Sequence, residues 1–586
     1  MIEIVSSFVE DMWLAGHADG IGACLCGYFK LAVITITMKI LITFYTFLIF
    51  NNLYSQGIVE MSRIDSLLQP FNKHNAPGLS IGILENGKLI YCKGIGLANI
   101  ETTTENSGSS IFGIASIAKQ LTAACIWSLI RENKISLDDD IRKYIPEFQS
   151  CGEKILVRHM LNHTSGIRNY HAIMELAGFD YNKEFHDNST ILELACKQKG
   201  LNNIPGEKVI YGNTAYTLLA IIIERVTGQH LDEYAKNKIF LPLGMNHTFY
   251  RTETSSIIPN RALGYVQNDD NSFEHLSSNQ ITYGAGSVGS SIEDLAIWSN
   301  ILNGLNDDYL ELTKFLTTVE ILPGGEVAKY ARGVMVDEYK SKKVVHHSGY
   351  GLGGQSQIIV VPELNLAVII LTNLESIDPS PLSYRILDLF LPFQNTEILK
   401  SAETFHPKKR DLKKYVGQYK EQNSDMKMEI LIENDTLKAL GGQGKKSIPL
   451  YSMGKGKFIR ANNSSVRYDF ISARKSKADL IVYFGGTPFY FSKAQFIDFN
   501  TINFTDYVGH YYSEELSVEY EIYIKNNSLF VNYPNHNNTK LSAGQKDEFG
   551  NGQRILYHFV RDKENEVVKL YLSAEGTVKD IEFIKK

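Results

Sequence analysis

Residues 112–130, FGIASIAKQLTAACIWSLI, place Ser116 and Lys119 where a long apolar-periodic helix is expected to begin. Positions i and i+3 lie on one face of a helix, so these two side chains are about one turn apart. A lysine amine in a dry site loses its charge and can act as a base towards a serine hydroxyl. The backbone N–H of a serine in the first turn can also bind an oxyanion. The stretch therefore predicts the first half of a serine acyl-transfer site.

The same spacing recurs elsewhere, so the motif alone is weak. Ser-x-x-Lys occurs four times, beginning at Ser116, Ser424, Ser452 and Ser472. The last three fall in strand-like sequence with scattered glycines, where we expect solvated turns. Only Ser116 opens a long apolar-periodic helix.

Two further short motifs sharpen the prediction. Tyr-x-Asn occurs at Tyr211-Gly212-Asn213 and at Tyr533-Pro534-Asn535, and His-x-Gly occurs once among 15 histidines, at His347-Ser348-Gly349. The order Ser-x-x-Lys, Tyr-x-Asn, His-x-Gly arises only from Ser116, Tyr211 and His347. Each motif is weak alone, whereas the ordered set with its flanking sequence is specific.

This set resembles the penicillin-recognising serine hydrolases, in particular the class C β-lactamase-like family with its DD-peptidase, D-aminopeptidase and esterase relatives. The resemblance covers roughly residues 60–395 and includes five longer segments, which are 76–100, 157–167, 205–228, 284–300 and 346–373. In the first of these, Asn86-Gly87 is a strong signal for a type I′ hairpin turn. The resemblance implies an α+β fold in which helices flank a central antiparallel sheet, with a mostly helical subdomain.

The resemblance also assigns catalytic roles to residues of the three motifs. Ser116 is expected to attack a carbonyl carbon, and Lys119 either takes its proton or tunes the tyrosine that does. Tyr211, beside Lys119, is expected to hold a lowered pKa and to pass the proton to the leaving group. Asn213 is expected to orient Lys119 and to bind the substrate.

The remaining site residues come from the predicted strand that carries His-x-Gly. The oxyanion hole is expected to use the backbone N–H groups of Ser116 and Tyr350, with Ser348 and Gly349 beside the substrate. No metal or other cofactor is required by this chemistry. The pair His159 and His163, spaced i and i+4, lacks the His-Glu-x-x-His pattern and belongs to a family segment.

His347 departs from the pattern of β-lactamases in this family, which place lysine at this position. Lysine there helps to hold the carboxylate of the substrate, and a neutral histidine attracts a carboxylate less. Histidine at this position is also found in family peptidases and esterases. A dedicated β-lactamase is therefore less favoured than an enzyme acting on other amides or esters.

Composition limits the class of protein and its partners. The chain has 586 residues, 44% hydrophobic and 21% charged, with a formal net charge of −6. It carries no basic stripe, which argues against a nucleic-acid partner. Cys92 and Cys125 fall in apolar patterns and are expected to be buried free thiols, although a disulfide stays open. Substrates are expected to be small peptides, amides or esters, including those derived from peptidoglycan, and the oligomeric state is open.

The N-terminal sequence predicts export. Met38-Lys39 and the apolar residues that follow read as a secretory signal ending near Ser55, so residues 1–57 are interpreted as a mis-started leader plus signal peptide. This predicts a periplasmic or extracellular protein. The alternative is a membrane anchor with the folded part outside the cytoplasm, although Lys39 would cost roughly 2.5–3.5 kcal/mol at the centre of a span.

An internal repeat follows the catalytic region. We predict a serine hydrolase domain at 58–395, a linker at 396–411, and two β-modules at 412–495 and 504–586. Tyr-Val-Gly-x-Tyr occurs at 415–419 and again at 507–511, a shift of 92 residues, and the same shift aligns 429–437 with 521–529. Each copy is long enough for a small, closed or nearly closed antiparallel barrel. Because no catalytic motif falls there, deleting both modules is expected to change substrate range more than chemistry.

Three functions are compatible with these residues. The favoured one is a serine hydrolase that forms an acyl-enzyme on Ser116 and cleaves D-amino-acid-containing peptides or related amides. A carboxylesterase or weak β-lactamase would use the same chemistry. A non-catalytic penicillin-binding or sensor protein is the alternative of another class, and the intact set of motif residues argues against it.

Overall fold

The structure is a computed structural model that describes residues 61–148, 152–180, 184–277, 279–391, 409–441, 447–471, 478–484, 486–494 and 502–586. The chain divides into two compact units, 1–69 and 70–586, and the described part of the first is helical over 61–68. The predicted leader, residues 1–57, and most of the linker lie outside the described residues. None of the helices in the described ranges combines the length and apolarity needed to cross a membrane.

The catalytic part of the second unit is built on a six-stranded antiparallel sheet in the order β14-β15-β16-β17-β1-β2. Its strands are β1 (Leu79–Glu85), β2 (Lys88–Ile95), β14 (Met335–Tyr339), β15 (Lys342–Gly351), β16 (Gly354–Val361) and β17 (Leu366–Thr372). Asn86 and Gly87 both have positive φ between β1 and β2, at 51° and 79°. Positive φ at both central residues defines the predicted type I′ turn, which is confirmed.

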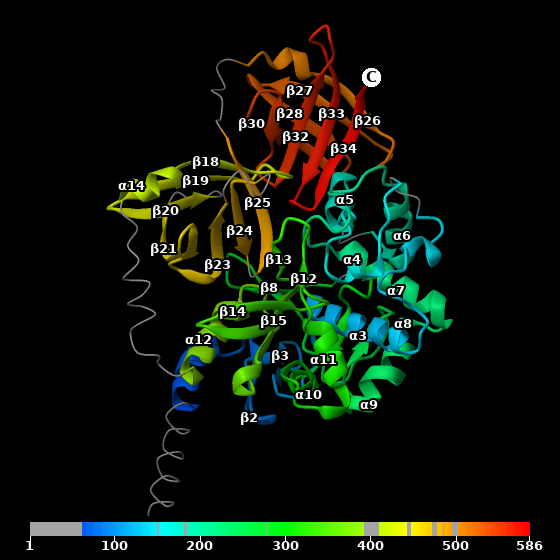
Figure 1. The fold of residues 1–586 in the computed structure, drawn as a ribbon, viewed down its shortest axis with the longest axis vertical. Helices are drawn as coiled ribbons and strands as arrows, with labels where there is room; N and C mark the ends of the chain where they lie inside the picture. The colour runs from blue at the N-terminus through cyan, green and yellow to red at the C-terminus, as the bar shows by residue number, and fades with distance from the viewer. Residues whose placement is uncertain are drawn as a thin grey trace, which may run out of the picture. The chain divides into compact units, whose positions relative to one another are not determined.

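Helices cover this sheet and build the subdomain beside it (Figure 1). Helices α10 (Ile292–Asn303) and α12 (Pro379–Phe390) pack on β16 and β17, and all seven residues of β17 are buried, as in a strand covered on both faces. The other described helices of the catalytic part are α3 (Ala118–Arg131), α4 (Val157–Leu161), α5 (Tyr170–Leu176), α6 (Asn188–Lys197), α7 (Asn213–Thr227), α8 (Leu231–Ala235), α9 (Leu241–Leu243) and α11 (Leu310–Thr317).

Helix α7 is the centre of the helical subdomain. Residues 214–223 are all buried, and α7 packs against α3, α4, α5 and α6. Its apolar residues are on every side, which suits a helix surrounded by other helices. This position fixes Asn213, the first residue of α7, against α3, which carries Lys119.

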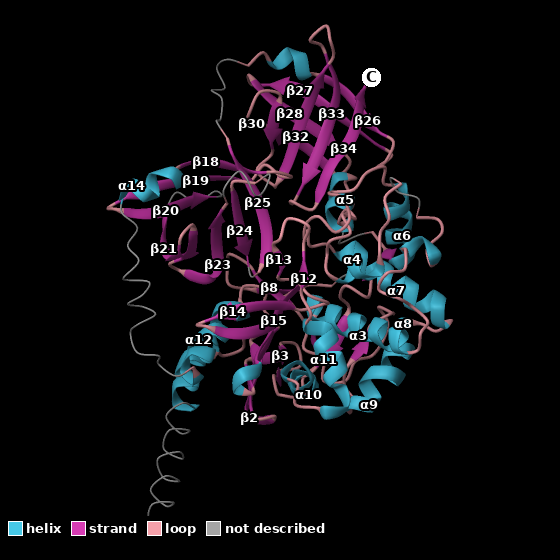
Figure 2. Cartoon of the chain, viewed as in Figure 1, coloured by secondary structure: helices cyan, strands magenta, loops and turns pink. Residues whose placement is uncertain are grey.

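The C-terminal part is made almost entirely of strands (Figure 2). The first module is a closed eight-stranded barrel of β18 (Gly417–Glu421), β19 (Lys427–Glu433), β20 (Thr436–Gly441), β21 (Ile448–Gly454), β22 (Lys457–Arg460), β23 (Asn463–Phe470), β24 (Leu480–Phe484) and β25 (Thr487–Lys493). Apolar side chains from all eight strands form its main core, and Ala478, Ile481, Tyr483 and Tyr490 form a separate small cluster.

The second module is a nine-stranded antiparallel sheet in the order β29-β28-β27-β26-β34-β33-β32-β31-β30. Its strands are β26 (Gly509–Ser513), β27 (Val518–Lys525), β28 (Ser528–Tyr533), β29 (His536–Lys540), β30 (Ser542–Ala543), β31 (Glu548–Gly550), β32 (Ile555–Arg561), β33 (Val567–Ala574) and β34 (Val578–Lys585). The predicted fold class, an α+β sheet-and-helix domain followed by two small β-barrel-like modules, is confirmed.

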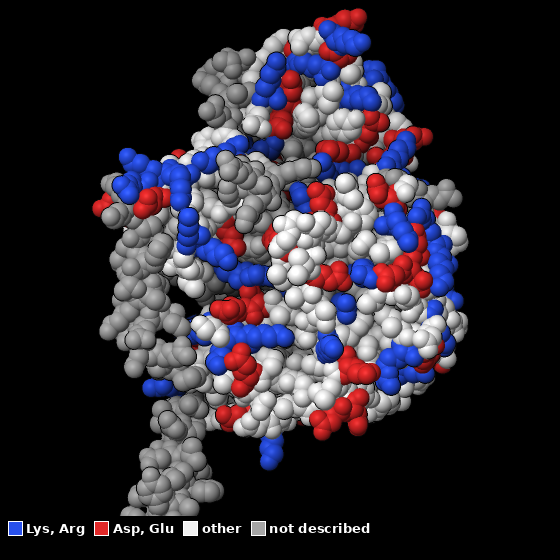
Figure 3. All heavy atoms as spheres, viewed as in Figure 1, with Lys and Arg blue, Asp and Glu red and all other residues white. Residues whose placement is uncertain are grey.

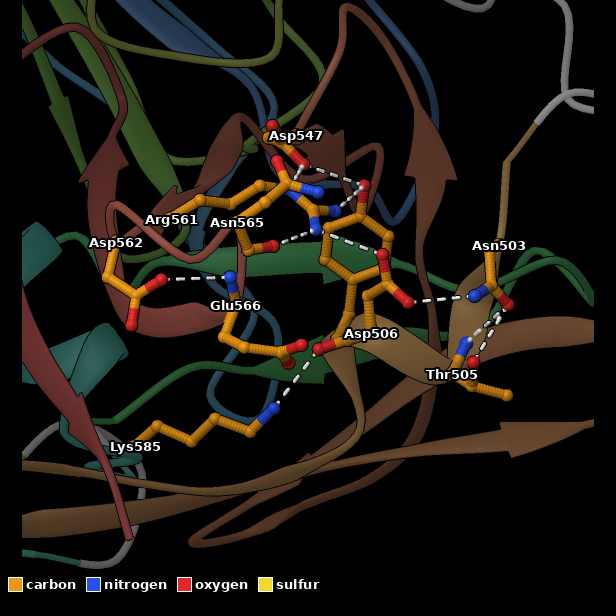
Figure 4. Close-up of polar contacts among 10 residues, drawn as sticks. Asn503, Thr505, Asp506, Asp547, Arg561, Asp562, Asn565, Glu566 and Lys585 are labelled. Carbon is orange, nitrogen blue, oxygen red and sulfur yellow. Dashed lines mark hydrogen bonds and ion pairs between the residues drawn. The ribbon is translucent and has the colours of Figure 1, made fainter.

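A polar network fixes the start of the nine-stranded sheet (Figure 4). The Arg561 guanidinium pairs with Asp506 and Asp547, both at 2.9 Å, and Lys585 Nζ donates to the Asp506 carbonyl at 3.0 Å. The Tyr507 hydroxyl donates to the same Asp547 carboxylate at 2.8 Å. The network therefore joins the turn before β26 to β32 and β34.

Three expectations about individual side chains are corrected by the structure. Ser424 and Ser452 are buried, at 0% and 7% exposure, with their hydroxyls bonded to Glu421 and to the Gly454 carbonyl, so neither lies in a solvated turn; Ser472 lies outside the described residues. Cys125 is a buried free thiol as expected, but Cys92 is exposed because it lies on β2, the edge strand of its sheet.

Over the face shown in Figure 3, Lys and Arg are interspersed with Asp and Glu.

Candidate active site

Ser116 lies in a single tight turn. The 3₁₀ turn Ala115–Ile117 comes directly before α3, so the nucleophile candidate precedes the regular helix by one turn. Ser356 Oγ donates to the Ile114 carbonyl at 2.8 Å, which fastens this turn to β16. A Cβ on Gly349 would lie 2.4 Å from the Ile114 oxygen. The glycine of His-x-Gly therefore lets β15 lie directly against the turn that carries Ser116.

Lys119 is fully buried and faces Ser116. Its Nζ lies 3.0 Å from Ser116 Oγ, 2.7 Å from Asn213 Oδ1 and 2.9 Å from the Ala285 carbonyl oxygen. Burial lowers the pKa of the amine well below its ordinary value. The neutral form of the amine has two N–H groups and one lone pair. Its two N–H groups can donate hydrogen bonds to Asn213 Oδ1 and to the Ala285 carbonyl oxygen. The lone pair is left facing the Ser116 hydroxyl, which is the arrangement of a base and a nucleophile.

The pKa of Tyr211 differs from the expectation. Burial raises the pKa of this phenol above its ordinary value, and a hydrogen bond with Ser116 only partly opposes the shift. The Lys119 amine lies 4.9 Å from the centre of the Tyr211 ring, so it sits over the ring face. The expected lowered pKa of Tyr211 is therefore wrong, because desolvation outweighs the effect of the neighbouring groups. The neutral phenol can still carry a proton between Ser116 and a leaving group.

His347 is buried and both of its ring nitrogens are engaged. Nδ1 lies 2.6 Å from the Ser348 carbonyl oxygen, and Nε2 lies 3.0 Å from the Tyr330 hydroxyl. A carbonyl only accepts, so Nδ1 carries the hydrogen and Nε2 accepts from Tyr330. Burial lowers the pKa of His347 to about 3. This imidazole is neutral at physiological pH and presents no cation to a substrate.

Four residues at the site were not singled out by the sequence as functional. Asn169 and His171 hold Asn213: the Asn213 backbone N–H donates to Asn169 Oδ1 at 3.0 Å, and His171 Nδ1 lies 3.0 Å from Asn213 Nδ2. The His163 ring packs 4.4 Å from that of Tyr211 and 4.3 Å from that of Tyr330. His163 lies in residues 157–167, one of the segments that carry the family resemblance, whereas no motif marks the other three.

The remaining predicted residues border the site on β15. Ser348 is exposed and the Tyr350 side chain is 65% exposed, with its hydroxyl donating to Glu375. Their backbone lies next to the Ser116 turn through Gly349. An oxyanion hole made by the Ser116 and Tyr350 N–H groups stays a prediction.

An open pocket of about 520 Å³ leads to Ser116. Asn213, His171 and Tyr350 line it near the nucleophile, while Arg251, Arg261 and Glu253 bring charges of both signs to its wall. Among the described residues, no group of three or more His, Cys, Asp or Glu side chains is placed to hold a metal ion. The pocket therefore combines the candidate nucleophile with a polar wall.

The comparison with known proteins agrees with this fold. The β-lactamase family model matches residues 64–389, more than half of the chain. The chain therefore belongs to the β-lactamase family.

Similar curated proteins include a D-aminopeptidase of Brucella anthropi and Protein flp of Staphylococcus aureus strain N315. The first is 25% identical over 349 residues, which cover 58% of this chain and 65% of that protein. The second is 29% identical over 327 residues, which cover 54% of this chain and 64% of that protein. The chain thus spans somewhat less than two thirds of the length of these relatives. Among solved structures, an octameric penicillin-binding protein homologue from Pyrococcus abyssi is similar, with a TM-score of 0.52 and 26% identity, over 74% of this chain and 100% of that one.

Proposed function

We propose that this chain is a serine hydrolase that forms an acyl-enzyme on Ser116 and cleaves peptides or amides containing D-amino acids. The observation that carries the proposal is the 3.0 Å separation between Ser116 Oγ and the buried, desolvated amine of Lys119. Burial lowers the pKa of this amine and so favours its neutral form, which can accept the serine proton as the bond to the substrate carbon forms. The similar D-aminopeptidase supports the substrate class.

The proposed reaction has two steps. In the first step, Ser116 Oγ attacks the carbonyl carbon of the substrate while the serine proton moves to Lys119 Nζ. The bond between the carbonyl carbon and the leaving amine then breaks, and the amine takes the proton from Lys119 through the Tyr211 hydroxyl. Water next adds to the acyl-enzyme, gives up a proton along the same path and releases a carboxylic acid with Ser116 restored. Because Tyr211 keeps a raised pKa, it acts as a relay rather than as the resting base.

The neutral His347 favours amides and esters over β-lactams. A β-lactam carries a carboxylate, and losing one charge-assisted hydrogen bond to it costs roughly 1.5–3 kcal/mol. That is about one to two orders of magnitude in rate if the contact acts in the transition state. An esterase is the second candidate function, and it is supported by the same neutral histidine.

A labelling experiment tests the nucleophile. The full chain is treated with a fluorophosphonate probe and a fluorescent penicillin, and the adduct is mapped by mass spectrometry with Ser116→Ala as control. We expect a single adduct on Ser116. Labelling of another serine, or equal labelling of the variant, contradicts the proposal.

A matched substrate panel tests the class of substrate. Paired D- and L-aminoacyl nitroanilides, short-chain nitrophenyl esters and a chromogenic cephalosporin are compared by kcat/KM. We expect the D-aminoacyl amides to exceed both their L-counterparts and the cephalosporin, and His347→Lys to raise relative activity on the cephalosporin. Preference for the esters would favour the esterase, and fastest turnover of the cephalosporin by the wild type would favour a β-lactamase.

A further inference from the structure

Residues 168–171 hold the first turn of α7 from one side. Besides the bond from the Asn213 N–H to Asn169 Oδ1, the Tyr170 N–H donates to Thr214 Oγ1 at 2.8 Å, and Thr214 Oγ1 donates to the Arg168 carbonyl at 2.8 Å. These bonds fix both of the first residues of α7. The position of Asn213, and with it the amide that faces Lys119, is therefore set by this segment.

His171 decides which way the Asn213 amide points. Burial lowers the pKa of His171 to about 3, so its ring is neutral, and its Nδ1 can accept a hydrogen bond from Asn213 Nδ2 at 3.0 Å. The amide NH₂ is thereby turned towards His171. The amide oxygen is left to face Lys119 Nζ at 2.7 Å. A reversed amide would present N–H bonds to the amine and lose that acceptor.

The nine-stranded sheet holds the other side of the same segment. The Asn169 N–H donates to the Thr577 carbonyl at 3.1 Å. The Arg168 guanidinium pairs with Glu515 Oε2 at 2.7 Å, with side chains only 3% and 4% exposed. It also donates to the Lys579 carbonyl at 2.6 Å and to the Asp580 carbonyl at 3.1 Å. Every one of these partners belongs to the sheet module.

Apolar packing continues this contact along α5. Ala172, Ile173 and Leu176 belong to the same buried cluster as the core of the nine-stranded sheet. The Tyr520 hydroxyl donates to the Leu176 carbonyl at 2.6 Å. After α5, Gly178 has a φ of 73°, and a Cβ there would lie 2.1 Å from the Pro534 carbonyl oxygen. The helix that begins at Tyr170 is therefore built into the core of the module.

We propose that the nine-stranded sheet is a working part of the catalytic site, because it holds residues 168–171 where they turn the Asn213 amide oxygen towards Lys119. Arg168 and Asn169 are positioning residues in this arrangement, since they touch neither the nucleophile nor the base. The inference rests on the proposed function of Ser116 and Lys119. It differs from the expectation that the modules affect substrate range more than chemistry.

The test compares Glu515→Gln with Glu514→Gln in the full chain. Glu514 is the matched control, because its side chain is 78% exposed and it pairs with the exposed Lys199. Displacement of a catalytic group by about 1 Å can cost on the order of a hundredfold in rate. We expect Glu515→Gln to lower kcat and the rate of Ser116 labelling by about tenfold to a hundredfold, with KM changed by less than about twofold. Glu514→Gln should match the wild type.

Hydrogen exchange gives a readout that does not depend on turnover. Glu515→Gln should speed the exchange of amides in residues 211–217, and Glu514→Gln should leave it unchanged. A folded Glu515→Gln variant with the labelling rate and the exchange of the wild type overturns the inference. If the wild type is not labelled at Ser116, the proposed function fails, and the exchange measurement still decides the inference.

A second pair of variants covers the case in which Glu515→Gln does not fold. Asn169→Asp keeps an oxygen that can accept from the Asn213 N–H, whereas Asn169→Ala removes it; both keep the backbone bond to Thr577. We expect the alanine variant to lose at least about tenfold in labelling rate relative to the aspartate variant. Equal rates in the two variants, at any level, overturn the inference.

Discussion

The closed barrel and the nine-stranded sheet begin with the same structure. Tyr419 and Tyr511 each donate a hydroxyl hydrogen bond to the carbonyl four residues earlier, both at 2.8 Å. Gly417 and Gly509 have φ values of 151° and 147°, and they pair with Ile430 and Ile522. Lys493 and Lys585, on the last strand of each module, each donate to a carbonyl before the first strand, both at 3.0 Å. The repeated motif thus specifies a hydrogen-bonded start to each module.

The two modules differ in their connection to the catalytic domain. The core of the barrel consists only of residues from 412–491. It meets the catalytic domain through polar contacts, such as Arg467 with Asp337 at 2.7 Å and the Tyr483 hydroxyl with Glu326 at 3.0 Å. The core of the sheet instead includes residues of α5. Two copies of one sequence motif therefore have different surroundings, and only the copy that shares its core with α5 supports Asn213.

They also differ at the end of the first strand. Glu421 ends β18 and is buried, with bonds from the Asn423 N–H at 2.9 Å and the Ser424 hydroxyl at 2.7 Å. The residue 92 positions later, at the end of β26, is the buried Ser513. Burial raises the pKa of Glu421 to about 7. The barrel therefore contains a buried acid where the sheet has a neutral side chain.

The largest expected difference between the modules is a pH dependence confined to the barrel. Glu421 ionises near pH 4.5 when unfolded but near 7 when folded, so the unfolded state loses its proton first as pH rises. The barrel should lose about 3 kcal/mol of stability between these values, at about 1.4 kcal/mol for each pKa unit. Glu421→Gln should remove this loss. Native-state hydrogen exchange of β18 and β19 peptides at pH 5 and pH 8 measures it.

An exposed glutamate on the next strand provides the control for that measurement. Glu429→Gln, on β19, should leave the pH dependence of the barrel as it is in the wild type. The predicted difference between the two modules is contradicted if peptides of β26 and β27 show the same pH dependence of exchange as those of the barrel. It also fails if Glu421→Gln behaves like the wild type at both pH values.

The next largest effect is expected in the sheet alone. Arg561→Met removes the charge-assisted bonds to Asp506 and Asp547 and should destabilise the start of the sheet by about 2 kcal/mol. Exchange should rise in peptides covering 503–513 and stay unchanged in barrel peptides. Arg554→Met is the matched control, because the Arg554–Glu575 pair is exposed and such pairs contribute about 0–1 kcal/mol. Equal effects of the two variants would refute the role of the network.

The smallest effect should be the same in both modules. Tyr419→Phe and Tyr511→Phe each remove one hydroxyl and leave one carbonyl without its partner, which costs about 1 kcal/mol. Exchange in the first strand of the respective module measures the loss. Clearly unequal losses would mean that the repeated motif has different roles in the two copies.

The sequence contained enough to predict which residues meet at the site, but not their ionisation. Ser116 and Lys119 are one helical turn apart, so their 3.0 Å contact follows from local geometry. The pKa of Tyr211 depends on burial by distant segments, and its direction was predicted wrongly. Asn169 and His171 were missed because only the packing of α5 against α7 brings them to Asn213.

The fold of the C-terminal part was likewise predicted from the sequence only in part. A 92-residue shift preserved the strand pattern and the turn, so two β-modules could be predicted from alternation and repetition. Whether eight strands close into a barrel or nine form an open series depends on long-range register, which the motif does not contain.

The close approach of Gly349 to the Ser116 turn has a practical consequence for enzyme engineering. Any side chain at 349 would collide with the Ile114 carbonyl and the Ser356 hydroxyl, so a mutant library should leave this position fixed. Tyr350, its immediate neighbour, lines the pocket and is 65% exposed, so its side chain can be varied, except to proline, which would remove the N–H of the predicted oxyanion hole. Two adjacent positions thus differ sharply: residue 349 has to remain glycine, whereas the side chain at residue 350 can be changed in directed evolution.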